Sequence, residues 1–449
     1  MAGGEWASDP RSVTVAGFCF DARQIKPGDC FVALRAGARD GHQFLAQALA
    51  GGAVAAVVEE VCDVALPQLL VQDSLLALGR LGAAARRAFK NPVVGVTGSC
   101  GKTSTKEMLR LLLGGDTGVH ATAANWNNRI GVPMTLLPLH RQEHTFAVVE
   151  AGINQPQEMQ LLAEMIQADL TVVTNVAAAH LELLGDLESV AGEKSLLAQC
   201  AHANSPIVLP CELLQYTAFS VLAARAVVLC PAGGTCDLPV RQKVYFSSQM
   251  STAGLMQLKL HDDCRSAVYS IHSSSCGMAQ NAALAILAAR ELGVDEPQIQ
   301  ARISAWRPSP NRGQVVQSGA QTFYIDCYNA NPASMLDALS AFTVAVSADL
   351  PRIYVLGAMN ELGQQAEAWH HSIGRALKLR TQDRVYFVGP ALLTEAYTAG
   401  AISRGADAQQ IRCFKKSENL KMEIAVLPSA VFLKGSRGYA LEQLMPRQR

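Results

Sequence analysis

The chain has no net charge, no long apolar run and no Cys-x-x-Cys pair. Lysine plus arginine and aspartate plus glutamate both total 38, so no overall field attracts nucleic acid or an anionic lipid surface. No apolar stretch approaches the ~18 residues that span a bilayer. Residues 1–6 contain neither a basic nor an apolar leader region, so we expect a cytoplasmic protein without membrane or nucleic-acid partners.

Motifs for several metal and nucleotide chemistries are also missing. The twelve cysteines are scattered, which predicts reduced, mostly buried thiols rather than a zinc site. No Asn-Lys-x-Asp motif for reading guanine is present.

Residues 140–144 match the His-x-x-Glu-His pattern of metalloproteases, which requires a helix. Pro138 precedes them and a strand-like run, 145–149, follows at once, so we predict a polar loop.

Length and pattern predict an α/β protein of about three domains. Hydrophobic residues make up 49% and charged residues 17% of the chain, as in a packed globular protein. Residues 1–88 mix short strands with helices. Residues 89–312 alternate strand and helix, which predicts a parallel sheet covered on both faces. A second α/β pattern occupies residues 313–449.

Finer features divide these segments. The alanine- and leucine-rich stretch 73–90 predicts a helix that leaves the first domain. Short alternating runs in 211–276 predict an antiparallel appendage on the central domain, and a long helix is expected at 279–292. The segment 307–313 contains two prolines and a glycine, which predicts a linker. The other expected strands are 146–150, 170–176, 322–325, 352–356, 384–388 and 430–433.

A glycine-rich turn is the most informative motif. The β-branched run 93–97 enters Gly98-Ser99-Cys100-Gly101, and Lys102-Thr103-Ser104 begins a helical pattern. Such a turn aims backbone N–H groups and the positive end of a helix at one point, which suits a polyphosphate. The strict P-loop pattern has glycine in place of Val96, and a purely structural turn is the alternative. We predict a nucleoside triphosphate there, with Lys102 on the outer phosphates and Thr103 on Mg²⁺.

Three more side chains are candidates for the same chemistry. Glu150 ends a strand, and the carboxyl ends of parallel strands face the ligand crevice, so it could share the Mg²⁺ of Thr103. The alternative is a solvated carboxylate at a strand end. His180 could equally be structural or merely exposed, and composition alone makes Lys194 a surface lysine. Two domains flank the phosphate-binding one, which suggests that ATP drives the joining of two substrates.

Three blocks of sequence resemble the Mur ligase family and together span nearly the whole chain. The Tyr-Asn-Ala-Asn-Pro string is typical of members that add D-alanyl-D-alanine to UDP-N-acetylmuramoyl-tripeptide. The Asp-Asn-Pro-Arg motif of ligases that add the third residue is absent. The matching strings are Asp21-Ala22-Arg23, Asp40-Gly41-His42, Asn125-Trp126-Asn127-Asn128, Ala179-His180-Leu181-Glu182, Tyr328-Asn329-Ala330-Asn331-Pro332, Glu361-Leu362-Gly363 and Lys434-Gly435-Ser436-Arg437.

The resemblance implies an amide ligase of peptidoglycan precursor synthesis. ATP would phosphorylate the tripeptide carboxylate, and the dipeptide amine would attack the resulting acyl phosphate. It further implies a central P-loop ATPase domain (89–312) between a UDP-binding domain (1–88) and a Rossmann-like ligase domain (313–449). Both substrates are small molecules, and we expect a monomer.

The resemblance also implies residue roles. Two Mg²⁺ ions are expected, one held by Thr103 and Glu150, the other by His180 and a Lys194 that CO₂ has carbamylated. The predicted catalytic residues are Lys102, His180 and Lys194. The remaining expected contacts are Gly98, Ser99, Cys100, Gly101, Ser104, Asn281, Arg312 and Asp326 for ATP; Asp21, Arg23, Asp40, Gly41, His42, Asn125, Asn127 and Asn128 for the UDP-peptide; and Asn329, Asn331, Ser334, Lys434, Ser436 and Arg437 for the dipeptide.

Several positions depart from the family pattern. Ala22 replaces a hydroxyl residue, Arg129 replaces an acidic one, and no Gly-x-His-Asn string precedes Asn281. Alanine also stands at position 358, where aspartate is usual. None of these changes alters the predicted phosphate and metal residues, so we expect an active enzyme. The alternatives are another Mur-type or folylpolyglutamate-type amide ligase, and a non-catalytic nucleotide-binding relative.

Overall fold

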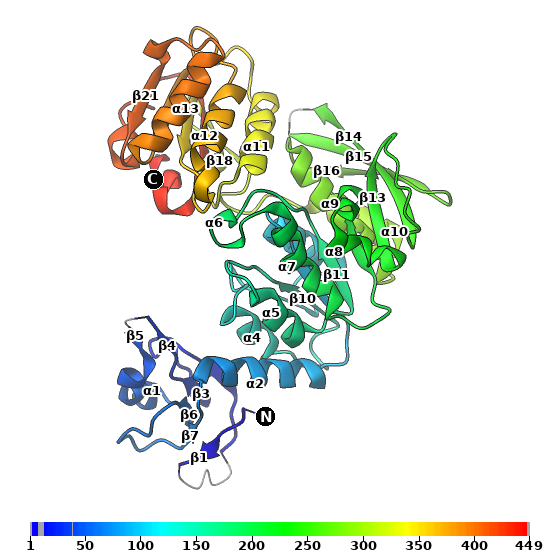
Figure 1. Cartoon of the computed structure of the whole chain (residues 1–449), viewed down its shortest axis with the longest axis vertical. Coiled ribbons are helices and arrows are strands. Elements are labelled where there is room, and N and C mark those ends of the chain that lie inside the picture. Colours follow the sequence, from blue (N-terminus) through cyan, green and yellow to red (C-terminus); the bar gives the residue numbers. More distant parts are fainter. Residues whose placement is uncertain (1, 8–12, 38, 253, 447–449) are drawn as a thin grey trace.

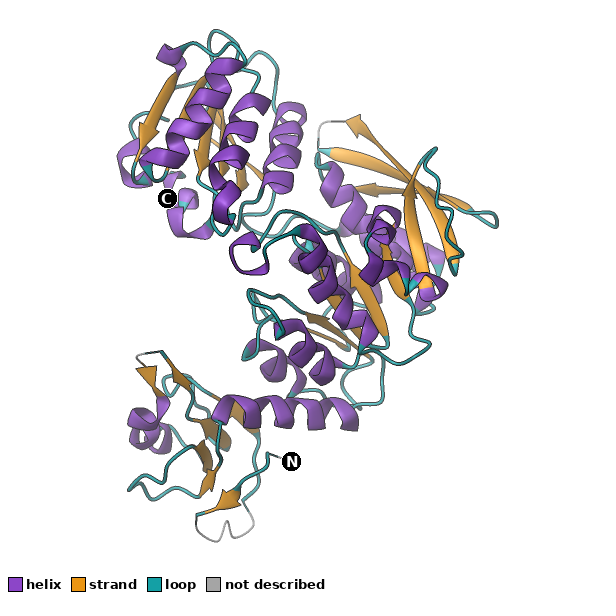
Figure 2. Cartoon of the chain, viewed as in Figure 1, coloured by secondary structure: helices purple, strands orange, loops and turns teal. Residues whose placement is uncertain are grey.

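Three sheets of five, nine and six strands, each in its own stretch of chain, organise the computed structural model (Figure 1), and β4 and β5 form a separate two-stranded pair. The structure describes residues 2–7, 13–37, 39–252 and 254–446. Helices flank the two larger sheets, whose strands run mostly parallel, so the predicted α/β fold class is confirmed (Figure 2). The three units follow one another in chain order along an arc, with the amino-terminal sheet at one end and the carboxy-terminal sheet at the other.

The amino-terminal sheet has the strand order β1-β7-β6-β3-β2, and β1 runs antiparallel to its neighbour. Its buried strand β3 alternates between two cores, because Val32 packs with helix α2 and Phe31 packs with helix α1. The elements are β1 (Glu5–Trp6), β2 (Gly17–Cys19), β3 (Asp29–Val32), β4 (Arg35–Ala36), β5 (Arg39–Asp40), α1 (Leu45–Ala50), β6 (Ala55–Val58), β7 (Gln68–Leu70) and α2 (Ser74–Ala88).

Helix α2 connects this unit to the next. It begins where the Asp73 carboxylate accepts a hydrogen bond from the Leu76 amide, one turn into the helix. Near its other end the buried Arg86 donates to the carbonyls of Ile166 and Gln167 and to the Asp169 carboxylate, each at 2.8 Å. One guanidinium therefore holds the end of α2 against the central unit.

The central sheet places the P-loop strand, β8, where the strand order reverses. The order is β16-β15-β14-β13-β12-β11-β8-β10-β9, so the chain passes from β8 to one side and then returns to the other. Ligands of open α/β sheets bind at such a reversal, beyond the carboxyl ends of the strands. The elements around β8 are β8 (Val93–Thr97), α3 (Lys102–Leu113), β9 (Val119–Ala121), α4 (Gly131–Leu136), β10 (Phe146–Glu150), α5 (Glu158–Ile166), β11 (Leu170–Val173), α6 (Leu181–Leu184) and α7 (Leu187–Gln199).

The expected antiparallel appendage needs correction, because these strands extend the central sheet itself. Strand β14 pairs in parallel with β13, and only β15 and β16 add an antiparallel edge. Side chains of β15 alternate between buried and exposed, since one face packs into the core that contains α9 and the other is open. The elements here are β12 (Ile207–Pro210), α8 (Thr217–Ser220), β13 (Ala226–Pro231), β14 (Gln242–Thr252), β15 (Leu255–His261), β16 (Ser266–Ile271), α9 (Cys276–Glu291) and α10 (Glu296–Ala305).

The carboxy-terminal sheet follows the predicted linker, which contains no helix or strand. Its order is β17-β18-β22-β19-β20-β21, with β17 antiparallel to β18 and the other pairs parallel. The sequence analysis missed β17 and β21, both at sheet edges. The elements are β17 (Gln314–Ser318), β18 (Gln321–Asp326), α11 (Pro332–Ala345), β19 (Arg352–Gly357), α12 (Ala366–Ala376), β20 (Arg384–Val388), α13 (Ala391–Ser403), β21 (Ile411–Phe414) and β22 (Ser429–Lys434).

Two smaller expectations have different outcomes. Residues 140–144 form turns rather than a helix, as predicted. The expectation that most cysteines are buried is wrong: all twelve are free thiols, but only Cys30, Cys230 and Cys327 are buried. No helix among the described residues is long and apolar enough to cross a bilayer.

We predict that Arg86→Ala destabilises the protein by about 2–3 kcal/mol, because buried carbonyl groups lose their donor. Thermal unfolding followed by circular dichroism should show a lower midpoint. Arg87→Ala, at an exposed position on the same helix, is the matched control and should unfold like the wild type. Equal midpoints for Arg86→Ala and the control would contradict the role given to Arg86.

Candidate active site

The P-loop turn has the shape that a phosphate site needs. Gly98 has φ +147° and Gly101 has φ +82°, and a Cβ at Gly98 would lie 1.8 Å from Thr174 Oγ1. Only glycine fits there. Helix α3 starts at Lys102 without a side-chain cap, so its first N–H groups have no partner within the helix. These amides, together with the helix dipole, favour an anion in front of the turn.

The segment after β11 fixes the turn, a role that the sequence analysis did not assign. The Asn175 carbonyl accepts from the Ser99 amide at 3.1 Å, and its side-chain oxygen accepts from the Cys100 amide at 3.0 Å. The Thr174 hydroxyl donates to the Cys100 carbonyl at 2.5 Å. The strand expected over 170–176 therefore ends at Val173. Polar residues directly after a strand beside the P-loop strand were the available signal.

Thr103 and Glu150 come together as the shared Mg²⁺ site requires. The Thr103 hydroxyl lies 3.2 Å from Glu150 Oε1, across 47 residues of sequence. Asn127, expected at the UDP-peptide, instead donates to the same oxygen at 2.8 Å. The second oxygen, Glu150 Oε2, is buried without a partner among the described residues. An unpaired buried carboxylate oxygen is costly unless a cation completes it, so these donors fit a divalent metal.

Two fixed positive charges surround this oxygen cluster. Lys102 Nζ donates to the Gly98 carbonyl at 2.7 Å, folded back over its own loop, and burial lowers the pKa of its ammonium. Arg312, from the linker, donates to Thr103 Oγ1 at 2.9 Å. The linker thus reaches Thr103, and the expected contact of Arg312 with the phosphates stays a prediction.

Lys194 lies in helix α7 and is fully buried, which its interpretation as a surface lysine did not anticipate. Its Nζ has no hydrogen-bond partner among the described residues. Burial, with the neighbouring Lys102 ammonium as a second cause, lowers the pKa of Lys194 well below its usual range. The structure therefore contains a buried amine whose charged form is disfavoured.

His180 is held across the boundary between the central and carboxy-terminal units. Its backbone is left-handed, with φ +59°, and its Nδ1 lies 2.6 Å from Glu361 Oε2. This contact is the main cause that lowers the pKa of the Glu361 carboxyl. Glu361 was part of a matching family string, but the sequence analysis gave it no role.

A cavity of about 430 Å³ opens at this boundary. Its size suits a small molecule. Four predicted dipeptide residues line it, and Asn125, expected at the UDP-peptide, lies in the same wall. The lining residues are Ala124, Asn125, Ala179, His180, Tyr328, Asn329, Ala330, Asn331, Asn360, Glu361, Ser436, Arg437 and Gly438.

Other predicted dipeptide and ATP residues have structural partners. Ser334 and Asn331 form a reciprocal capping box at the start of α11. Lys434 is buried and pairs with Asp326 at 2.6 Å, so neither side chain is free in this structure. Asn281 in α9 packs against the P-loop turn, where a Cβ at Gly101 would lie 2.5 Å from its Oδ1. Its predicted adenine contact stays a prediction.

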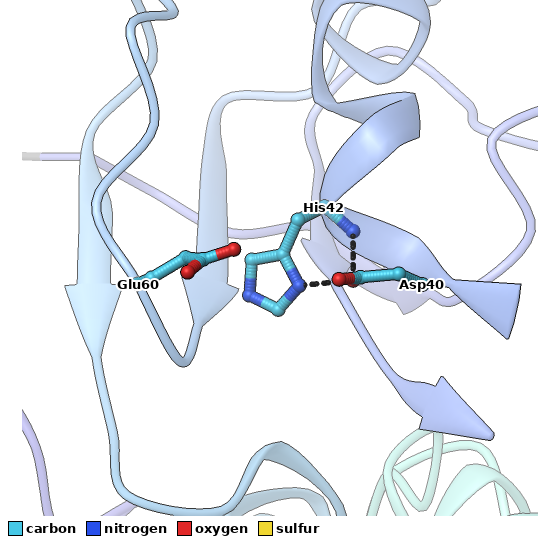
Figure 3. Close-up of side chains that lie close together, drawn as sticks. All are labelled: Asp40, His42 and Glu60. Atoms are coloured by element: carbon cyan, nitrogen blue, oxygen red, sulfur yellow. Dashed lines mark hydrogen bonds and ion pairs between the residues drawn. The ribbon is translucent and has the colours of Figure 1, made fainter. Parts of the chain in front are cut away.

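The predicted UDP-peptide residues of the amino-terminal unit form local ion pairs. Asp21 pairs with Arg23 at 2.7 Å. His42 Nδ1 lies 2.5 Å from Asp40 Oδ1, with Glu60 on the other side of the ring (Figure 3). His42 Nε2 accepts the Glu59 amide at 2.8 Å, so both ring nitrogens are engaged. Asp40, His42 and Glu60 are all side chains that can bind a metal ion, but no nitrogen of the His42 ring is left for a cation.

Two of the predicted UDP-peptide residues, Asp40 and Asn128, also shape their own backbone through hydrogen bonds, and their contact with substrate stays a prediction. The His42 amide and ring lower the pKa of Asp40 to about 2, which keeps that carboxylate charged and holds the loop at Gly41. Asn128 accepts from the Ile130 and Gly131 amides and so shapes the start of α4.

Comparisons with known proteins agree with this geometry. Family models described as the Mur ligase middle domain and the Mur ligase, glutamate ligase domain match residues 96–289 and 311–437. A UDP-N-acetylmuramoyl-tripeptide–D-alanyl-D-alanine ligase of Synechocystis is 33% identical over 395 residues, which cover 87% of this chain and 82% of that protein. The Escherichia coli ligase of the same name is 32% identical and covers 96% and 93%.

A solved structure extends the likeness to three dimensions. The crystal structure of MurF from Acinetobacter baumannii has a TM-score of 0.85 and 28% identity, covering 98% of this chain and 95% of that one. The resemblance stated from sequence motifs is confirmed: with such relatives along almost its whole length, this chain belongs to the Mur ligase family.

Proposed function

We propose that this chain joins D-alanyl-D-alanine to UDP-N-acetylmuramoyl-tripeptide with the energy of ATP, in peptidoglycan precursor synthesis. The relatives bear the name of that activity. The observation that carries the proposal is the cavity that both the Tyr328–Asn331 segment with Arg437 and His180 of the central unit line. We further propose that residues 1–88 bind the UDP moiety, residues 89–312 bind ATP and residues 313–449 bring the dipeptide. A cytoplasmic location, where nucleotide-linked precursors and ATP are available, belongs to this proposal.

The chemistry brings two anions into contact, the γ-phosphate and the terminal carboxylate of the peptide. The carboxylate oxygen attacks phosphorus to give an acyl phosphate and ADP. The dipeptide amine then attacks the carbonyl carbon, phosphate leaves, and the nitrogen loses a proton. Lys102 and Arg312 supply positive charge at the point of contact, where it offsets the repulsion and stabilises the developing charge.

A divalent cation fits beside these residues. Thr103 and Glu150 would hold it, as the unpaired Glu150 Oε2 indicates, and Mg²⁺ bound there would neutralise charge on the phosphates. His180 and a modified Lys194 are the proposed holders of a second ion. Arg312 donates a hydrogen bond to Thr103 Oγ1 in this structure. When phosphate and the metal ion bind, Thr103 would exchange Arg312 for the metal ion.

The surroundings of Lys194 support the proposal that CO₂ carbamylates it. CO₂ reacts with a neutral amine to give a carbamate. The nitrogen bonds to the carbon of CO₂ and loses a proton, and the two oxygens carry the negative charge. Lys194 is buried, its Nζ has no hydrogen-bond partner among the described residues, and its lowered pKa favours the neutral amine. A carboxylate at this place would bind a cation, which an ammonium cannot do.

Exclusion of water explains why a separate carboxy-terminal unit takes part. An acyl phosphate exposed to water would hydrolyse, so the site must be covered while it exists. Glu361 and Arg312 already join that unit and the linker to the central unit.

The direct test is a coupled assay of ADP release. We expect release only when ATP, the UDP-tripeptide and D-alanyl-D-alanine are all present. Release with another acceptor amine in preference to the dipeptide would point to a sibling or folylpolyglutamate-type ligase. ATP binding without turnover on any acceptor would indicate a non-catalytic relative.

We predict that Lys194→Ala and Lys194→Arg both lose ligation by at least 100-fold while ATP still binds. Arginine keeps a positive charge but cannot be carbamylated. Lys194→Arg therefore separates a role of positive charge at this position from a role of the carbamate. Wild-type protein equilibrated with ¹³C-bicarbonate should show a carbamate carbon signal that both variants lack. Wild-type turnover in either variant would contradict the carbamate.

We predict that Lys102→Ala weakens ATP binding by at least 10-fold, since a charge-assisted hydrogen bond contributes about 1.5–3 kcal/mol. Isothermal titration calorimetry measures the affinity. Lys90→Ala, at an exposed position before the strand, is the control and should bind like the wild type. An unchanged affinity in Lys102→Ala would place the triphosphate elsewhere.

A further inference from the structure

The charged groups of the boundary cavity form an opposed pair. Among its described lining residues, Glu361 is the only carboxylate and Arg437 the only guanidinium. The remaining wall is made of the His180 imidazole, amides, hydroxyl groups and small apolar side chains, including Ala179 and Ala330. A free dipeptide carries an ammonium at one end, a carboxylate at the other and, for alanine, two methyl groups. The cavity therefore matches a zwitterion with small side chains.

The backbone at Glu361 is constrained, although its side chain is half-exposed. Its backbone is left-handed, with φ +64°, a conformation that costs a non-glycine residue free energy and persists only where the surroundings enforce it. Its carbonyl accepts from the Glu182 amide at 3.4 Å. Gly363, two residues on, packs against the Glu182 backbone so closely that a Cβ would lie 3.2 Å from its Cα. The loop is thus held against the central unit at Glu361 and two residues after it.

The two carboxylate oxygens of Glu361 differ in their contacts. Oε2 contacts His180 at 2.6 Å, which leaves Oε1 available to a second donor. The side chain is 53% exposed, so a ligand in the cavity can reach it. An ammonium at Oε1 would lie beside His180, on the side of the central unit where the activated peptide must arrive.

The opposite charge is fixed relative to Glu361. The Asn360 amide donates to Ser436 Oγ at 2.9 Å, which connects the loop of Glu361 to the loop of Arg437. The Arg437 guanidinium lies over the Tyr328 ring at 5.3 Å from its centre, an arrangement that restricts a long side chain. The Glu361 carboxylate and the Arg437 guanidinium are therefore both positioned by loops of the carboxy-terminal unit that contact each other.

We propose that Glu361 binds the ammonium group of the incoming dipeptide and, with Arg437, sets its direction in the cavity. The amine points to His180 and the carboxylate to Arg437 over Tyr328. This assignment rests on the proposed function and adds the residue that recognises the nucleophile end of its second substrate. It implies that a dipeptide whose amine is acylated binds more weakly, because Glu361 then has no cation to pair with.

The test compares two ligands that differ only in the ammonium. D-alanyl-D-alanine and N-propanoyl-D-alanine have the same methyl groups and carboxylate, but the second has no amine. Calorimetry on the full-length enzyme loaded with a non-hydrolysable ATP analogue and Mg²⁺ measures both. Glu361→Gln should weaken D-alanyl-D-alanine binding at least 10-fold and leave N-propanoyl-D-alanine binding unchanged. Glutamine keeps an acceptor for His180, so that contact can persist.

Controls separate recognition from structure. Glu367→Gln removes an exposed carboxylate six residues further along the same unit and should change neither affinity. In steady-state assays Glu361→Gln should raise KM for the dipeptide at least 10-fold with KM for ATP unchanged. Equal loss for both ligands, or no loss for either, would overturn the role of Glu361. The proposed function fails on a different observation, namely no dipeptide-dependent ADP release by the wild-type enzyme.

Discussion

Repulsion between two anions is the constraint on which this molecule depends. A triphosphate and a carboxylate approach each other only where positive charge has been collected in advance. The structure meets this need at the carboxyl ends of β8 and β10, where Thr103 contacts Glu150 and where Lys102 and Arg312 converge. Among the described residues, Glu150 Oε2 and Lys194 Nζ are buried without hydrogen-bond partners, which is costly for each group. The proposed metal ion and carbamate would remove this cost.

The fold supports this arrangement from several directions. Thr174 and Asn175 fix the phosphate turn, and Asn127 orients Glu150. These contacts come from segments that are distant in sequence but adjacent at the point where the strand order reverses. The carboxy-terminal unit contributes through Glu361, which meets His180 at the boundary. Its own interior is organised separately, with the buried Lys434–Asp326 pair beneath the cavity wall.

Local patterns in the sequence were sufficient for the phosphate site. Gly98 and Gly101 have the conformations that only glycine tolerates well, and a strand that ends in Glu150 lies beside the P-loop strand. Longer-range facts were not accessible. Lys194 looks like a surface lysine because its burial depends on packing of α7 against other elements. His42 and Ser334 resemble ligand contacts, yet their polar atoms are used by Glu59 and by the capping of α11. The edge strands β17 and β21 were missed because edges carry weak patterns.

The central claim is that Thr103 and Glu150 hold a metal ion against the outer phosphates of ATP. A crystal structure with Mn²⁺ and a non-hydrolysable ATP analogue tests it most directly, because Mn²⁺ is located by anomalous scattering. The account predicts that one of the anomalous peaks is bound by Thr103 Oγ1 and Glu150 Oε2, with Lys102 turned from the Gly98 carbonyl to the phosphates. Phosphates bound elsewhere, or a Glu150 carboxylate that points away from every metal, would contradict it.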